Sequence, residues 1–82
     1  MVDYVQTLSD LLEPLVDNKD SIKVQQMEGL NDDEVVLYVY AKEDEIARLI
    51  GKKGQMAMAV RDSMAIAGRK DNKRIVVKFE EL

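Results

Sequence analysis

The residues most able to do chemistry in this chain are two lysines between two glycines, within IARLIGKKGQMAMAV at residues 46–60. Gly51 and Gly54 place small residues where the backbone must turn between two apolar stretches, and they let a partner approach the main chain. We expect the amides of this loop, with the first N–H groups of a following helix, to bind phosphate. Lys52 and Lys53 would attract that anion over a longer range.

The distribution of charge supports an anionic partner, although the Gly-x-x-Gly spacing alone is weak evidence. Average glycine usage would produce such a spacing by chance about 0.4 times in a chain of this length. The net charge is −4, with three basic and twelve acidic side chains in residues 1–47. Residues 48–74 carry eight basic side chains against two acidic ones. This local excess indicates an anionic ligand, while ordinary solvated faces remain an alternative for charge alone.

Composition argues against several other classes of function. The chain has no cysteine and no histidine, so we expect no catalytic activity, no cofactor and no metal site. Turn chemistry and helix-start charge explain the acidic clusters at residues 32–34 and 43–45. A nucleotide-binding P-loop needs a longer glycine spacing and a Lys-Ser/Thr pair where this chain has Gln55 and Met56. With no apolar run near the roughly 20 residues of a membrane span and no export signal, we expect a cytoplasmic protein that does not contact membrane.

Hydrophobic periodicity predicts the elements that position the glycine loop. Helical spacing predicts a helix over residues 2–17, with a kink or restart near Glu13 because Pro14 removes a backbone donor. A polar break at 17–20 follows. Alternation and β-branched content predict strands at 22–27 (edge), 35–40 (central) and 75–79, with a turn at 30–33. Short and longer helices are predicted at 44–50 and 55–67, and a polar basic loop at 68–73.

The chain resembles the K homology (KH) domain in its bacterial type II topology, αββααβ. The resemblance lies in the order of the predicted elements, which is strand, helix, GKKG, helix, basic loop and strand. The residues that carry the resemblance are Ile46, Leu49, Ile50, the loop 51–54, Ala57, Ala59, Val60 and Arg61. LLEPLVDNKDSI near the start and NKRIVVKF near the end are similar to the small bacterial RNA-binding proteins of the KhpA family. The resemblance implies one α+β domain over residues 1–82, with a three-stranded sheet packed against three helices.

The resemblance also implies a groove for single-stranded RNA, with its phosphates along GKKG, which clamps about four nucleotides. An apolar floor would come from Ile50, Ala57, Val60 and Val76 or Val77. No aromatic side chain is placed for stacking in this groove, so we expect modest base discrimination. The RNA-binding residues it implies are Ile50, Gly51, Lys52, Lys53, Gly54, Gln55, Ala57, Arg61, Arg69, Lys70, Lys73 and Arg74.

The chain departs from the family pattern at three positions. Gln55 and Met58 stand where the family usually has basic residues, which predicts weaker and less salt-sensitive binding. Ala57 replaces a larger aliphatic residue, which could widen the groove. These departures keep open a second hypothesis, a protein-interaction module whose RNA function has decayed. A helix-hairpin-helix DNA binder is a third, weaker hypothesis, because that motif has one residue between its glycines.

The resemblance further implies partners. Proteins of this family form homodimers and pair with a larger bacterial protein of the Jag type, which contains a KH domain. It also implies a role in post-transcriptional control, as an RNA chaperone linked to cell shape, elongation and division.

Overall fold

The computed structural model describes residues 3–16, 19–29 and 31–82. Helix α1 (Tyr4–Leu12) begins at Asp3, whose side chain accepts a hydrogen bond from the Gln6 N–H at 3.1 Å. It ends in a 3₁₀ turn at Glu13–Leu15 that contains Pro14. The kink or restart predicted near Glu13 is therefore observed as a change from α-helix to a 3₁₀ turn. The first residue of the predicted helix and residues 17 and 18 of the predicted polar break lie outside the described residues.

The sheet has three strands in the order β1–β2–β3. Strand β1 (Lys23–Glu28) pairs antiparallel with β2 (Glu34–Ala41), and β3 (Arg74–Glu81) pairs parallel with β2. The predictions of an edge strand, a central strand and a last strand are confirmed. The turn expected at 30–33 includes residue 30, which lies outside the described residues, and a turn at residues 32 and 33 leads into β2.

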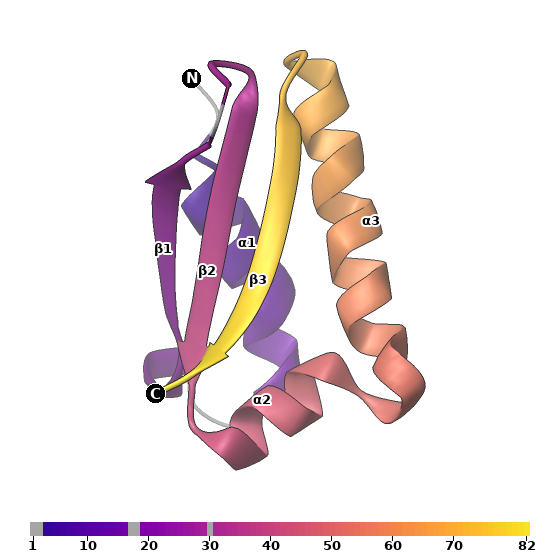
Figure 1. The fold of residues 1–82 in the computed structure, drawn as a ribbon. Helices are drawn as coiled ribbons and strands as arrows, with labels where there is room; N and C mark the ends of the chain where they lie inside the picture. Colours follow the sequence, from indigo (N-terminus) through magenta and orange to yellow (C-terminus); the bar gives the residue numbers. More distant parts are fainter. Residues whose placement is uncertain (1–2, 17–18, 30) are drawn as a thin grey trace.

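Parallel pairing requires a long crossover between β2 and β3, and two helices make it. They are α2 (Glu43–Ile50) and α3 (Gln55–Lys70), joined by a 3₁₀ turn at Lys52–Gly54. Figure 1 shows α1 behind the sheet, α3 alongside β3, and α2 below them. The αββααβ order and the α+β fold class predicted from sequence are confirmed.

The core lies between the helices and one face of the sheet. On β2 the burial alternates, as expected for a strand with one covered face. The side chains of Val36, Tyr38 and Tyr40 point to the other face. The largest fully buried side chains are Leu8, Leu12, Leu37, Val39, Leu49 and Met64.

The predicted loop at 68–73 is wrong in its first half, because α3 continues to Lys70. The Lys73 N–H donates to the Gly68 carbonyl at 2.8 Å and the Asn72 N–H to the Arg69 carbonyl at 3.2 Å. With Asn72 at a φ of 56°, these bonds form a Schellman motif. The left-handed residue that ends the helix is thus Asn72, and Gly68 is a buried helical residue.

None of the described helices is long and apolar enough to cross a membrane.

Candidate nucleic-acid interface

Helix α2 ends at Gly51 because of the backbone conformation there. Glu43, Asp44 and Glu45 occupy its first turn, where carboxylates complement the helix dipole. The Gly51 N–H still donates to the Ala47 carbonyl at 3.0 Å. At φ 76° and ψ 177°, Gly51 occupies a region open almost only to glycine. The chain therefore turns sharply into the two lysines.

The turn itself uses the left-handed region twice more. Lys53 has φ 57° and Gly54 has φ 75°. The Gly54 N–H donates to the Gly51 carbonyl at 3.2 Å, and the Gln55 N–H donates to the Lys52 carbonyl. Two amides expected to face a ligand are thus engaged inside the turn. This is a correction to the expectation that the loop as a whole presents its donors outward.

Helix α3 begins directly at this turn without a capping side chain. Its N-cap is Gly54, which has no side chain to accept a hydrogen bond from the first turn. A Cβ built on Gly54 would meet no atom within 4 Å, so the space beside it is open. A helix N-terminus that is positive and open to solvent suits an anion.

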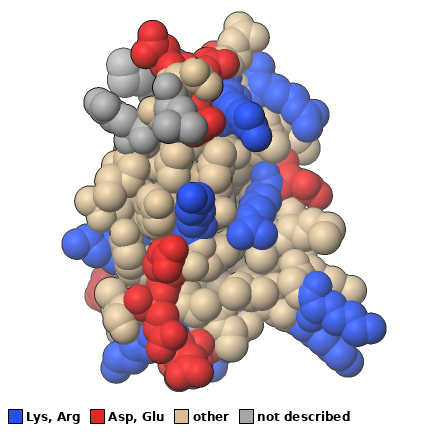
Figure 2. Space-filling model, viewed as in Figure 1, with Lys and Arg blue, Asp and Glu red and all other residues tan. Residues whose placement is uncertain are grey.

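The two lysines of the turn are exposed. In Figure 2 basic side chains project from the lower right of the molecule, where Figure 1 places the connection between α2 and α3. Ile50 and Gly51 beside them are half-buried, and Gln55 is exposed. The structure thus brings residues 50–55 together as one corner of the surface.

Arg61 connects α3 with β3. Its Nε donates to the Val77 carbonyl at 3.2 Å, and its guanidinium carbon lies 5.5 Å from the centroid of the Phe79 ring. Sequence reasoning assigned Arg61 to RNA and did not pair it with Phe79. No local signal could have done so, because the two residues lie on different elements whose packing is tertiary.

The apolar floor predicted for the groove is mostly internal. The exposed fractions of Ala57, Val60 and Val77 are 3%, 5% and 3%, and these side chains face the interior. Val76 points to the opposite face of the sheet from its neighbour Val77. Of the predicted floor residues, half-buried Ile50 is the one that lies beside the turn. Correcting the prediction, we find that buried Ala57 offers little surface to a base.

The second basic cluster lies at the far end of α3. Its members are Arg69, Lys70, Lys73 and Arg74. The 16 residues of α3, rising about 1.5 Å each, separate this cluster from Gly54 by roughly 20 Å. Lys73 is partly engaged, since its Nζ donates to the Asp32 carbonyl at 3.1 Å. The structure therefore does not bring the two clusters together.

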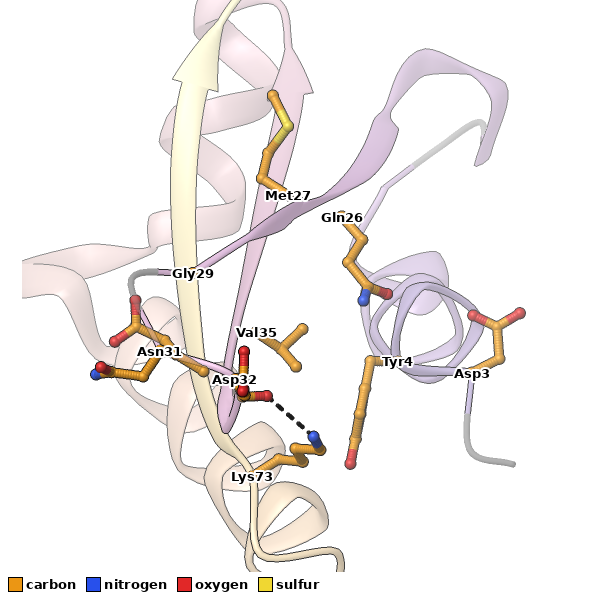
Figure 3. Close-up of a pocket in the computed structure, with 10 residues that line it drawn as sticks. Asp3, Tyr4, Gln26, Met27, Gly29, Asn31, Asp32, Val35 and Lys73 are labelled. Carbon is orange, nitrogen blue, oxygen red and sulfur yellow. Dashed lines mark hydrogen bonds between the residues drawn. The ribbon is translucent and has the colours of Figure 1, made fainter.

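A hollow of about 810 Å³ lies between the start of α1 and the β1–β2 connection. Figure 3 shows Lys73 reaching from the start of β3 toward Asp32 across this hollow. The lining includes the carboxylates of Asp3, Asp32 and Glu34. Acidic walls repel phosphate, and the hollow contains no residue of the glycine turn. It is not the site that the sequence predicts.

Comparisons with known proteins agree with the fold and extend the argument. The family model described as "KhpA/KhpB, KH domain" matches residues 5–79. The chain is 36% identical to the RNA-binding protein KhpA of Aquifex aeolicus, over 94% of this chain and 100% of that protein. It is 32% identical to the RNA-binding protein KhpA of Clostridium acetobutylicum, over 90% and 96% of the two chains. It is 34% identical to the RNA-binding protein KhpA of Bacillus subtilis, over 92% of this chain and 93% of that protein. No solved structure gives a significant match.

Proposed function

Because the chain belongs to the KhpA/KhpB family of KH domains, we propose that it is a non-catalytic protein that binds single-stranded RNA. The observation that carries this proposal is the turn between α2 and α3. It presents two exposed lysines and an uncapped helix N-terminus with open space at Gly54. The relatives' shared description as RNA-binding proteins supports the same ligand.

In this proposal, phosphates lie along residues 50–55, and the lysines supply most of the attraction. Arg61 extends the contact along α3, exchanging its bond to the Val77 carbonyl for the ligand. Arg69, Lys70, Lys73 and Arg74 contact only an RNA long enough to reach the far end of α3. A site that neutralises two to four phosphates gives an affinity of about 10⁻⁴ to 10⁻⁶ M.

Such weak binding calls for a second binding module. We propose that the protein acts as a single KH domain, either as a homodimer or with a larger Jag-like (KhpB-like) protein that contains a KH domain. Linked sites raise the effective affinity by orders of magnitude without new contacts. Action in the cytoplasm on RNA, in post-transcriptional control and as an RNA chaperone linked to cell shape, belongs to the same proposal.

A second candidate function is a protein-interaction module with a decayed RNA site. Exposed apolar side chains on α3 favour it, since Met58 is 61% exposed and Ile66 is 55% exposed. Methionine is an adaptable interface residue, and Met58 stands where relatives of this kind usually carry a basic one. The two functions predict different effects of the turn lysines.

The double substitution Lys52→Asp and Lys53→Asp separates them. We expect RNA binding, measured by fluorescence anisotropy with a labelled oligouridylate, to weaken by at least about 100-fold, because local repulsion replaces attraction. Thermal stability should change little, since both side chains are exposed. Lys42→Asp, which changes an exposed lysine before α2 by the same charge, is the control. Lys53→Asp alone should weaken RNA binding far more than this control does. Unchanged RNA affinity in the double variant would reject the turn as the site.

A further inference from the structure

The face of the sheet that points away from the helices carries an ordered group of side chains. On β2 this face presents alternate residues from Glu34 to Tyr40, and the strand register places the neighbours of each. Beside Tyr40 lie Lys23 on β1 and Glu80 on β3, and beside Tyr38 lie Gln25 and Lys78. We call this surface the sheet face. Its residues are Lys23, Gln25, Met27, Glu34, Val36, Tyr38, Tyr40, Arg74, Val76, Lys78 and Glu80.

Two tyrosines form the centre of the sheet face. The ring centroids of Tyr38 and Tyr40 are 5.9 Å apart, and their planes differ by 14°. The Nζ of Lys78 lies 5.8 Å from the centroid of the Tyr38 ring. Both tyrosines are half-buried, so each ring keeps surface open to solvent. Two nearly parallel rings beside a cation offer a stacking partner and a charge partner together.

The charge of the sheet face differs in sign from that of the chain. It holds three cations (Lys23, Arg74, Lys78) and two carboxylates (Glu34, Glu80), whereas the whole chain carries −4. Figure 2, which views this side, shows a largely uncharged centre, with basic side chains on it and acidic ones toward the end of β3. The face therefore has a small positive balance, and two of its cations, Lys23 and Lys78, lie beside the tyrosine rings.

The chemistry that fits this face is that of a nucleobase and its phosphate. Single-stranded nucleic acid binds where bases stack on aromatic rings and cations follow the backbone. Sheets are well suited to this, because alternate side chains stand on one face and can hold several bases side by side. A second copy of the chain is a poorer occupant, because it would bury the lysines around the rings away from water. The observations favour RNA over protein.

We propose that the sheet face is a second binding surface for single-stranded RNA, in which Tyr38 and Tyr40 stack bases and Lys78 and Lys23 contact the adjoining phosphates. This surface is separate from the α2–α3 turn and shares with the proposed function only the class of ligand. Strand β3 lies between the sheet face and Arg61 of α3, because Phe79 packs against Arg61 on the helix side while Lys78 stands on the sheet face. In this proposal an RNA too long for the turn also occupies the sheet face.

The test compares Tyr38→Leu/Tyr40→Leu with Tyr38→Phe/Tyr40→Phe, using oligouridylates of about 4 and about 12 nucleotides. Leucine keeps apolar cover on the sheet and removes stacking, whereas phenylalanine keeps the ring. We expect the leucine variant to bind the longer RNA about 10-fold or more weakly and the shorter RNA unchanged. The phenylalanine variant should match the parent on both. Equal binding of the longer RNA by the leucine and phenylalanine variants would overturn the proposal.

Photocrosslinking of the unaltered protein keeps the proposal testable if the leucine variant fails to fold. Oligouridylate containing 4-thiouridine should crosslink to Tyr38 or Tyr40 and leave Tyr4, which is 7% exposed, unmodified. Crosslinks confined to residues 50–55 would overturn the proposal. So would a leucine variant that loses self-association in sedimentation while keeping its RNA affinity, because the face would then be a protein interface. In the Lys52→Asp/Lys53→Asp background, residual binding that still depends on the tyrosines supports the sheet face independently of the turn.

Discussion

At the scale of single residues, Gly51 and Gly54 serve different physical purposes in the turn between α2 and α3. A Cβ on Gly51 would lie 2.5 Å from Cγ and 2.9 Å from Cβ of Met56. Its backbone also occupies a region that other residues almost never adopt. Gly54 adopts an ordinary left-handed conformation with nothing within 4 Å of an added Cβ. The spacing of the motif predicts a turn, but it does not reveal this asymmetry.

Alanine substitutions should therefore rank the two glycines. We expect Gly51→Ala to lower the free energy of unfolding by about 3 kcal/mol, since it adds a clash to a forbidden backbone conformation. Gly54→Ala should cost only about 1 kcal/mol, the penalty of a left-handed alanine. Urea denaturation of both variants measures the difference. Equal losses would show that the close contact of Gly51 with Met56 does not contribute.

At the scale of elements, the end of α3 is defined by its packing on β3. Gly68 is buried, and a Cβ there would lie 2.5 Å from Cγ1 of Ile75 and 2.6 Å from the Lys73 carbonyl oxygen. The helix can approach the strand this closely only because residue 68 has no side chain. The sequence predicts a helix over 55–67 and a polar loop that begins at this glycine. The tertiary contact explains the glycine better, because the helix continues past Gly68 to Lys70 and is followed by a turn in which Asn72 is left-handed.

This packing reverses the usual effect of a glycine-to-alanine change in a helix. Within an unobstructed helix the substitution stabilises by about 1 kcal/mol. We expect Gly68→Ala instead to lower the melting temperature, because α3 must move away from β3. Ser63→Ala, at an exposed position of the same helix, provides the control and should be neutral or slightly stabilising. A melting temperature raised by Gly68→Ala would contradict the close packing.

At the scale of the whole molecule, one hydrogen bond joins α1 to the distant α3–β3 connection. The Tyr4 hydroxyl donates to Oδ2 of Asp71 at 2.6 Å. This bond to a carboxylate, together with burial and the nearby negative charge, raises the pKa of Tyr4 from 10.0 to about 12. The residues are 67 positions apart, so the bond forms only when the complete fold is assembled.

The raised pKa makes the stability of the fold depend on alkaline pH. In the folded state the Tyr4 hydroxyl keeps its proton to a higher pH than in the unfolded state. Its stabilisation is fully present below about pH 10 and is lost as the pH rises through about 12. The measurement is the free energy of unfolding by urea denaturation at about pH 8 and about pH 11. It should fall less between these pH values for Tyr4→Phe than for the parent, because the variant has no hydroxyl proton at residue 4. The titration of lysines is common to both proteins and cancels in the comparison. If the parent and Tyr4→Phe differed in free energy of unfolding by the same amount at both pH values, the role of the hydroxyl proton would be contradicted.

The sequence by itself determined the order of elements, the central strand, the glycine turn and the family. These features follow from local causes: the period of apolar residues, the strand-forming run at 35–40, the proline that ends α1, and glycines at a turn. The resulting boundaries are close to those of α2, α3 and β2. The comparisons confirm the KH family that the sequence resembles.

Only the tertiary structure decided what each surface presents. Ala57 and Val60 lie in the interior instead of lining a groove, and Arg61 reaches across to the Val77 carbonyl. Sequence alternation put Tyr38 and Tyr40 on one face of a strand, but it could not show that the helices cover the opposite face. The physical reason is that exposure depends on which elements pack together, and that packing joins residues far apart in the chain.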